Sequence, residues 1–258
     1  MTTSIDAPLQ WLRRYPGPDG PDGSTESRPR LLCLPHAGGS ASFYFPLARA
    51  LAEQADVVVV QYPGRQDRRD EPTIDQLPVL AEHVIKAIVE LAGEDAPLAI
   101  FGHSMGAIVG YEVALGLADR DLPAPSRLFA SGRRAPSCYR NESIHELSDE
   151  GLLSALRGLG ATDPVLLNDP ELQAMILPAV RGDYTAIETY RHTPGRALTC
   201  PVTVLVGAAD QMVSIDEAAS WSGHTTGPTD LQVFPGGHFY LAERSEDVIA
   251  AVAERLTQ

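Results

Sequence analysis

The sequence has few cysteines, which limits the kinds of protein it can be. Cys33, Cys138 and Cys200 are odd in number and far apart, and no CxxC pair occurs. We therefore expect neither a disulfide framework nor a zinc site. No cluster of His, Cys and carboxylate residues has metal-ligand spacing, and neither GxxxxGKS/T nor GxGxxG is present. The sequence thus predicts no metal, no cofactor and no nucleotide-type phosphate site.

Long apolar runs are also missing. No run reaches the roughly 18–20 residues that a membrane span needs. The N-terminus lacks the basic start and apolar stretch of a secretory signal. Together with the unpaired cysteines, these absences predict a soluble cytoplasmic protein without a membrane partner.

Positive charge is scarce. The chain has 34 acidic and 20 basic residues, a formal net charge of −14, and Lys86 is its one lysine. Binding to nucleic acid or to an anionic membrane requires a basic face, so we expect neither partner.

Length and composition fit one domain spanning residues 1–258. The chain is 44% hydrophobic and 21% charged, an ordinary balance for a protein with a sizeable core. Pro, Gly and Asp are concentrated between Tyr15 and Ser27. We therefore predict that residues 1–29 are an N-terminal lead-in, which Trp11 and Leu12 anchor to the surface.

Short apolar segments alternate with helical patterns along the rest of the chain. The predicted strands are 31–34, 57–60, 98–101, 127–130, 202–206 and 231–234, and the predicted helices are 43–52, 74–91, 105–118 and 243–256. This alternation is typical of an α/β fold, with a mostly parallel sheet covered by helices on both faces.

One interval breaks the alternation. Between about 133 and 199 no convincing strand is found. Two helical patterns lie inside it, one around Leu152, Leu153, Leu156 and Leu159 and one around Leu172, Met175, Ile176 and Val180. A helical insertion between two core strands predicts a lid.

The sharpest motif is Gly102–Gly106 (GHSMG), which follows a predicted strand and opens a predicted helix. This is the context of a nucleophile elbow. The turn is so tight that Ser104 must adopt a strained backbone, and side chains at Gly102 and Gly106 would clash. Ser104 is then presented at the sheet edge, beside the positive end of a helix. The alternative is a serine N-cap with incidental glycines.

A serine nucleophile needs a general base, and the base needs an orienting acid. In α/β-hydrolases the chain order is Ser, then Asp or Glu, then His. Asp210 follows the fifth predicted strand and His238 the sixth, so both are expected at the sheet edge that presents Ser104. Asp216 and Asp230 are nearby rivals for the acid, and a cap or turn role is the alternative for Asp210 and His238.

The segment Pro35–Gly39 (PHAGG) follows the first predicted strand. The oxyanion of a tetrahedral intermediate needs two backbone N–H donors. One is expected from Met105, the residue after the nucleophile, and the other from this early loop. Ala37 is the first candidate and Gly38 the second; a plain Gly-rich turn is the alternative.

Five segments together carry a family resemblance: LCLPHAGG, QYPGR (Gln61–Arg65), GHSMG, VGAAD and FPGGHFYL. From about Trp11 to the C-terminus, the chain resembles the type II thioesterases, stand-alone editing enzymes of polyketide and nonribosomal-peptide synthesis. The elbow alone is generic to α/β-hydrolases, whereas the combination is specific to this group. The acid loop departs from the pattern: Ala208 and Ala209 precede Asp210, where members often have a charged residue.

The resemblance implies an α/β-hydrolase fold with a mobile helical lid. It assigns the triad to Ser104, Asp210 and His238 and the oxyanion donors to Ala37 and Met105. The implied substrate is an aberrant or stalled acyl group in thioester linkage to the phosphopantetheine arm of an acyl or peptidyl carrier domain. Hydrolysis would pass through an acyl-serine and need no cofactor. We expect a monomer that meets the carrier transiently, with a short, fairly unselective acyl chamber, because aromatic residues make up only 6% of the chain.

Several arginines lie in predicted loops. Most are expected to be solvated, and we hypothesise that some contact an acidic carrier domain or the phosphate of its arm. They are Arg65, Arg68, Arg69, Arg133, Arg134 and Arg140.

Three other functions remain open at this stage. A product-releasing thioesterase would determine final chain length or cyclise the product; such domains are usually fused to a synthase, and no carrier-domain remnant is present here. A generic carboxylesterase or lipase could use the same scaffold. A non-catalytic binding protein would be expected to lack part of the Ser, Asp and His set.

Overall fold

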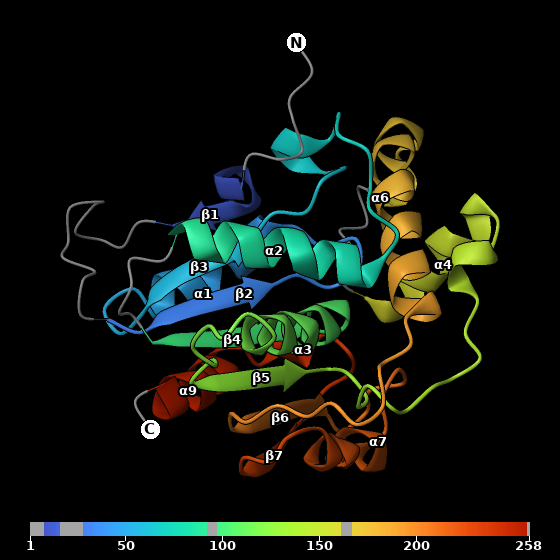
Figure 1. Ribbon diagram of the computed structural model, residues 1–258. Helices are drawn as coiled ribbons and strands as arrows, with labels where there is room; N and C mark the ends of the chain where they lie inside the picture. Colours follow the sequence, from blue (N-terminus) through green and yellow to red (C-terminus); the bar gives the residue numbers. More distant parts are fainter. Residues whose placement is uncertain (1–7, 16–27, 92–96, 161–166, 257–258) are drawn as a thin grey trace.

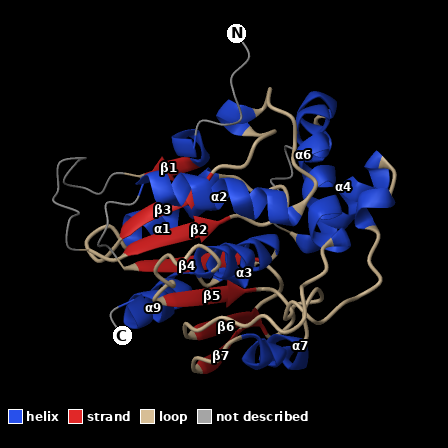
Figure 2. Ribbon diagram, in the orientation of Figure 1, coloured by secondary structure: helices blue, strands red, loops and turns tan. Residues whose placement is uncertain are grey.

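The residues described by the computed structural model, 8–15, 28–91, 97–160 and 167–256, form a seven-stranded sheet (Figures 1 and 2). In chain order the strands are β1 (Leu12–Arg14), β2 (Arg30–Leu34), β3 (Asp56–Val60), β4 (Leu98–His103), β5 (Arg127–Ser131), β6 (Val202–Gly207) and β7 (Thr229–Phe234). Their spatial order is β1-β3-β2-β4-β5-β6-β7, and β2 to β7 run parallel. All six predicted strands are present, which confirms the mostly parallel α/β sheet.

The central strands are apolar along most of their length because both faces of the sheet are covered. In β2, Leu32 and Leu34 belong to the core on one face, and Leu31 and Cys33 to the core on the other. The first core is completed by α2 and α3 and the second by α1 and α9, so the two helical layers enclose the sheet (Figure 1). A run such as that of β3 therefore buries every side chain.

The helices match the main helical patterns but differ at their ends. The α-helices are α1 (Phe45–Ala50), α2 (Leu77–Leu91), α3 (Met105–Ala118), α4 (Asp149–Leu159), α6 (Pro170–Thr189), α7 (Ile215–Ala219), α8 (Tyr240–Glu243) and α9 (Ser245–Leu256). The 3-10 helices are η1 (Pro8–Trp11), η2 (Ala41–Tyr44), η3 (Gln66–Arg68), η4 (Ile144–Glu146) and η5 (Ser220–His224). The sequence did not predict α7 and α8, because one turn of helix is too short to show a period.

The prediction that the N-terminal residues form a lead-in anchored to the surface is wrong for residues 8–15. Here η1 is followed by β1, which pairs antiparallel with β3. Trp11 is fully buried in the core rather than laid on the surface, and its ring stacks on His83 at 4.8 Å between centroids. A strand of three residues has too little alternation to be recognised, and its pairing depends on a partner some 45 positions later. The Pro-rich residues 16–27 lie outside the described part of the chain.

Two helices, α4 and α6, interrupt the sheet between β5 and β6, and we call them the inserted helices. They lie beyond the carboxyl ends of the strands (Figure 1) and pack on each other through a separate apolar cluster. Its members include Leu152, Leu153, Leu156, Leu177 and Val180. The described part of residues 133–199 contains no strand. Most of the first predicted pattern and Ile176 and Val180 of the second thus join the two helices, whereas Leu159 packs on a different core and Met175 is 54% exposed.

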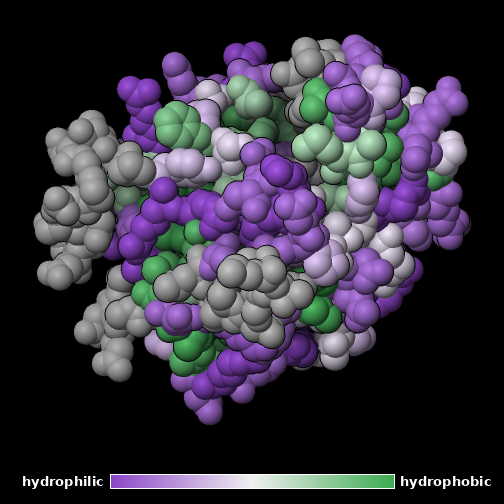
Figure 3. Space-filling model, turned by 90° about the horizontal axis from the view of Figure 1, so that it is seen from above, coloured by the Kyte–Doolittle hydropathy of each residue, from purple (hydrophilic) through white to green (hydrophobic). Residues whose placement is uncertain are grey.

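The face seen from above carries mostly polar side chains. Seen from above, the molecule is largely hydrophilic, with hydrophobic residues in small areas between (Figure 3). None of the helices in the described residues has the length and apolar character that crossing a bilayer requires.

Replacing Trp11 by alanine tests whether the lead-in is part of the core. Because its indole is fully buried, we expect the free energy of unfolding to fall by about 3–5 kcal/mol. The control is Phe45→Ala at a side chain that is 46% exposed, where the loss should stay under about 1 kcal/mol. Urea unfolding followed by circular dichroism measures both, and equal losses would contradict the burial of Trp11.

Candidate active site

Ser104 lies at the carboxyl end of β4, directly before α3. Its backbone has φ 53° and ψ −116°, so the strained conformation predicted for the motif is present. The Ser104 N–H donates to the Ser131 carbonyl at the end of β5 (2.8 Å). The elbow is thereby fastened to the neighbouring strand, and the serine is half-buried at the sheet edge.

The two motif glycines are required by the backbone around them. A Cβ at Gly102 would lie 2.1 Å from the Gly106 carbonyl oxygen, and one at Gly106 would lie 2.0 Å from the Leu34 carbonyl oxygen. Both positions are occupied by rigid backbone, so neither contact can be relieved by a side-chain rotation. The glycines thus let α3 start against β4 and the end of β2.

His238 and Asp210 form a direct pair at the same edge of the sheet. The His238 Nδ1 lies 2.8 and 3.0 Å from the two carboxylate oxygens of Asp210. The Met212 N–H donates to the same carboxylate at 2.8 Å. The Asp210 side chain is fully buried and that of His238 is 5% exposed. This carboxylate favours a proton on Nδ1, which leaves Nε2 as the nitrogen able to accept a proton.

Backbone contacts between two loops create this pair. The Ala208 N–H donates to the Phe234 carbonyl (2.8 Å) and the Ala209 N–H to the Gly236 carbonyl (2.9 Å). The loop after β6 therefore lies against the loop after β7. Asp230, a rival for the acid, lies within β7 and bonds instead to Arg255 at 3.0 Å.

The backbone N–H groups of the loop after β2 differ in whether they have a hydrogen-bond acceptor. The Gly38 N–H donates to the Asp183 carboxylate (2.7 Å) and the Gly39 N–H to the His36 carbonyl (2.9 Å). Within the described part of the chain, the Ala37 N–H has no acceptor. Met105 is the first residue of α3, and its N–H has no acceptor within the helix. Two N–H groups near Ser104 are therefore available to a ligand.

A buried ion pair holds this loop in place. The Arg65 guanidinium meets the Asp183 carboxylate through two hydrogen bonds (2.5 and 2.9 Å), and the two side chains are 8% and 1% exposed. Arg65 also donates to the carbonyls of Gly39 (3.2 Å) and Pro63 (3.1 Å). Asp183 belongs to α6, so the pair joins an inserted helix to the PHAGG loop. The sequence analysis did not identify Asp183. An acidic residue within the apolar stretch of this helix was the pattern that could have indicated a buried ion pair.

One cavity of about 300 Å³ brings these groups together. Ser104, His238 and Ala37 line it, and the inserted helices contribute apolar side chains such as Leu156, Ile176 and Val180. Arg133, Glu142 and Glu188 form a polar wall. Across the described residues, no group of three or more His, Cys, Asp or Glu side chains is placed to hold a metal ion.

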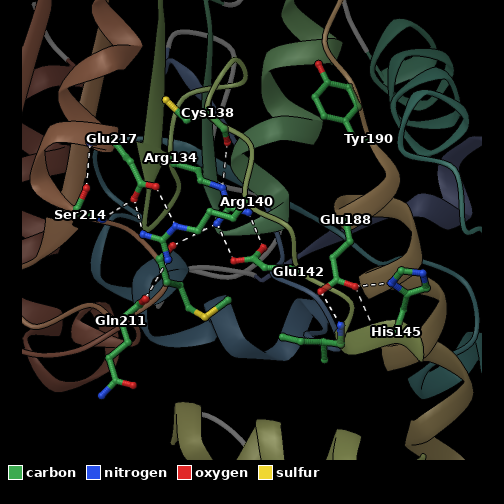
Figure 4. A network of polar contacts seen from close by, with 12 residues as sticks. Arg134, Cys138, Arg140, Glu142, His145, Glu188, Tyr190, Gln211, Ser214 and Glu217 are labelled. Carbon is green, nitrogen blue, oxygen red and sulfur yellow. Dashed lines mark hydrogen bonds and ion pairs between the residues drawn. The ribbon is translucent and has the colours of Figure 1, made fainter. Parts of the chain in front are cut away.

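The expectation that most of the loop arginines are solvated is wrong. Arg65, Arg68 and Arg134 are buried, and each is paired within the chain. Arg68 bonds to Glu71 and lies over the Trp11 ring. Arg134 bonds to Glu142, and the exposed Arg140 bonds to Glu217 (Figure 4). The last pair lowers the pKa of Glu217 to about 2. Except for the Arg68–Glu71 spacing, these partners are too far apart in sequence to be anticipated.

Comparison with known proteins supplies a name for this arrangement of residues. A family model described as a thioesterase domain matches residues 29–256. The chain is 43% identical over 256 residues to the probable cadicidin biosynthesis thioesterase of Streptomyces griseus, covering 99% of this chain and 68% of that protein. It is 43% identical over 254 residues to thioesterase PikA5 of Streptomyces venezuelae, covering 98% and 87%.

Solved structures agree. The type II thioesterase BorB of the borrelidin biosynthetic cluster superposes with a TM-score of 0.86 at 43% identity, covering 99% of both chains. RedJ, a thioesterase of the prodiginine pathway in Streptomyces coelicolor, superposes with a TM-score of 0.86 at 34% identity, covering 93% of each chain.

Removing the carboxylate of the buried ion pair should destabilise the protein strongly. Asp183→Asn leaves the Arg65 guanidinium without a counter-charge, and we expect the free energy of unfolding to fall by about 3–5 kcal/mol. Asp149→Asn is the control, since its partner Arg181 is at the surface and the Asp149 side chain is 70% exposed; its loss should stay under about 1 kcal/mol. Chemical unfolding measures both, and similar losses would refute the importance of the pair.

Two buried histidines predict a loss of stability in acid. Burial, with smaller effects of His238 and Arg65, lowers the pKa of His36 to about 3, and burial also lowers that of His103. Between the unfolded value of about 6.5 and these lower values, the unfolded chain binds more protons. Stability should therefore fall as the pH falls below about 6.5, by up to about 1.4 kcal/mol per pH unit for each histidine.

His36→Gln separates this effect from other acid effects. Between about pH 6 and pH 4, the free energy of unfolding of the variant should change less steeply with pH than that of the wild type, because the contribution of His36 is absent. This holds whatever the variant does to stability at pH 7. Urea unfolding at a series of pH values measures the slope, and parallel curves for the two proteins would show that His36 does not titrate as expected.

Proposed function

The chain belongs to the thioesterase family, and we propose that it hydrolyses aberrant or stalled acyl groups from the phosphopantetheine arm of acyl or peptidyl carrier domains. Relatives at 43% and 34% identity are named as thioesterases, one of them as a type II thioesterase of the borrelidin biosynthetic cluster and another as a thioesterase of the prodiginine pathway. The single observation that carries the proposal is the buried His238–Asp210 pair opening on the cavity that Ser104 lines.

In the proposed reaction Ser104 is the nucleophile. Its oxygen forms a bond to the thioester carbonyl carbon while His238 Nε2 takes the hydroxyl proton. The C–S bond then breaks, the thiol leaves with the proton from His238, and an acyl-serine remains. Water, deprotonated by His238, attacks this ester and releases the free acid and Ser104. Asp210 orients the imidazole and stabilises its charged form.

The oxyanion of each tetrahedral intermediate is assigned to the N–H groups of Ala37 and Met105. Support for Ala37 over Gly38 comes from the Gly38 N–H, which is already bonded to Asp183 at 2.7 Å. Support for Met105 comes from its place as the first residue of α3, where the N–H points out of the helix and the helix dipole favours negative charge. Preorganised donors of this kind need no rearrangement when charge develops.

Editing accounts for the cavity better than release of a finished product. A space of about 300 Å³ is at the small end for ligand pockets and fits a short acyl group better than a long chain. Product release or a carboxylesterase activity remain the competing functions. We further propose that the enzyme works as a cytoplasmic monomer without a cofactor and meets its carrier transiently, because every proposed step uses side chains and N–H groups of this one chain.

A hydrolysis panel tests the function. Propionyl- and butyryl-carrier thioesters should be hydrolysed faster than long-chain acyl thioesters and faster than p-nitrophenyl esters of the same acyl group. Ser104→Ala should lower kcat by at least about 10³-fold, and Asp210→Asn by about 10³- to 10⁴-fold, because the first removes the nucleophile and the second the group that fixes the imidazole tautomer.

The panel also separates the alternatives. Rapid ester cleavage with negligible thioester cleavage would favour a carboxylesterase. Long or cyclised products from extended chains would favour product release. Full activity in Ser104→Ala would refute the acyl-serine mechanism, and Asp216→Asn serves as the matched control for the acid because Asp216 lies in the first turn of α7.

A further inference from the structure

The Arg133 side chain lines the same cavity as Ser104 and His238. Its Nε is buried and has no hydrogen-bond partner in the described part of the protein. Buried donors without an acceptor are rare and unfavourable. No hydrogen bond or ion pair joins the Arg133 guanidinium to the described residues, so its remaining N–H groups are available to a ligand in the cavity that the residue lines. The mechanism above makes no use of this group.

The backbone places Arg133 close to the reacting atoms. It follows the end of β5 by two residues, and Ser131 in that strand pairs with His103, the residue before Ser104. Gly132 between them has φ +58°, and a Cβ there would lie 2.4 Å from the His103 ring. The Arg133 carbonyl accepts a hydrogen bond from the Trp221 indole (2.8 Å). These contacts fix the main chain at Arg133, and none of them involves its side chain.

The carboxylates of the cavity wall are engaged elsewhere (Figure 4). Glu142 receives two hydrogen bonds from Arg134, one of them at 3.0 Å. Glu188 accepts from the backbone N–H groups of Ile144 and His145 at 3.0 Å each, and it also bonds to the His145 imidazole. Both acids therefore contribute negative charge to the wall while their oxygens are occupied by other donors.

Charge decides what kind of ligand fits. Arg134 does not line the cavity but pairs with Glu142, so Arg133 and Arg134 together offset the formal charges of Glu142 and Glu188. Burial and the neighbouring Arg134 lower the pKa of Arg133 to about 9, and it still carries its proton near neutral pH. A ligand carboxylate would bring an unbalanced charge next to two glutamates, whereas a neutral oxygen would satisfy the free N–H donors without one.

We propose that Arg133 is a substrate-binding residue that donates hydrogen bonds to a neutral oxygen on the acyl chain, close to the thioester. The enzyme then favours acyl groups with a 3-oxo or 3-hydroxy substituent over saturated acyl groups of the same length. This inference rests on the proposed function of the cavity and adds a substrate class to it. It replaces the hypothesis that Arg133 binds the phosphate, which lies at the far end of the arm from the thioester.

Matched four-carbon thioesters test the proposal. The kcat/KM values of 3-oxobutyryl, 3-hydroxybutyryl and butyryl N-acetylcysteamine thioesters are compared in the wild type, Arg133→Met and Arg133→Lys. In the wild type the oxygenated substrates should be preferred by roughly 10- to 100-fold, the usual effect of a hydrogen bond from a charged donor. Arg133→Met should lose most of this preference, and Arg133→Lys should retain part of it.

Controls keep the outcomes distinct. Arg140→Met alters an arginine paired with Glu217 outside the cavity lining, and it should leave the preference for oxygenated substrates unchanged. A wild type without that preference, or an Arg133→Met variant that retains it, overturns the inference while leaving the thioesterase function standing. A preference for a malonyl thioester that depends on Arg133 would also overturn it, in favour of an anion site.

Two further results complete the test. Failure of the wild type to hydrolyse any of the thioesters would refute the proposed function itself, and this inference with it. If Arg133→Met does not fold, inhibition of the wild type by non-hydrolysable amide analogues replaces the variant: the 3-oxobutyryl amide should bind more tightly than the butyryl amide, and equal inhibition would overturn the inference.

Discussion

The buried ion pair between Arg65 and Asp183 is the constraint on which the site depends. It joins the turn after β3, the loop after β2 and the inserted helix α6 through hydrogen bonds that include the Gly38 N–H and the Gly39 carbonyl. Removing two charges from water is unfavourable unless their hydrogen bonds are satisfied, and here they are. The same bonds that satisfy the charges therefore hold the proposed oxyanion loop and connect it to the helix that closes the cavity.

The opposite wall of the site depends on close approach of backbone rather than on charge. Gly102 and Gly106 leave no room for a side chain, so β4 and α3 meet at a strained serine. The loops after β6 and β7 touch through main-chain hydrogen bonds, which bring the Asp210 carboxylate to His238. Strain at Ser104 is maintained because the elements around it are themselves fixed by the sheet.

The polar wall formed with Arg133 shows how a predominantly apolar cavity can acquire chemical selectivity. Arg133 and Arg134 together offset the charges of its two glutamates, so the wall recognises oxygen atoms rather than ions. An editing enzyme with only an apolar pocket would discriminate acyl groups by size, whereas unpaired buried donors penalise every substrate that lacks an acceptor. The inserted helices contribute the apolar lining and Glu188, and the segment after β5 contributes Arg133 and Glu142.

The sequence by itself determined the parallel sheet, the strained turn at Ser104 and the order of Ser104, Asp210 and His238, because these follow from local periodicity, from glycines and from the positions of strand ends. It did not determine the short antiparallel β1, the Asp183 partner of Arg65 or the pairing of Arg134 with Glu142. Those depend on side chains and strands that meet only in the folded chain. Only the tertiary structure could show which arginines are already neutralised, and that the buried Nε of Arg133 has no hydrogen-bond partner among the described residues.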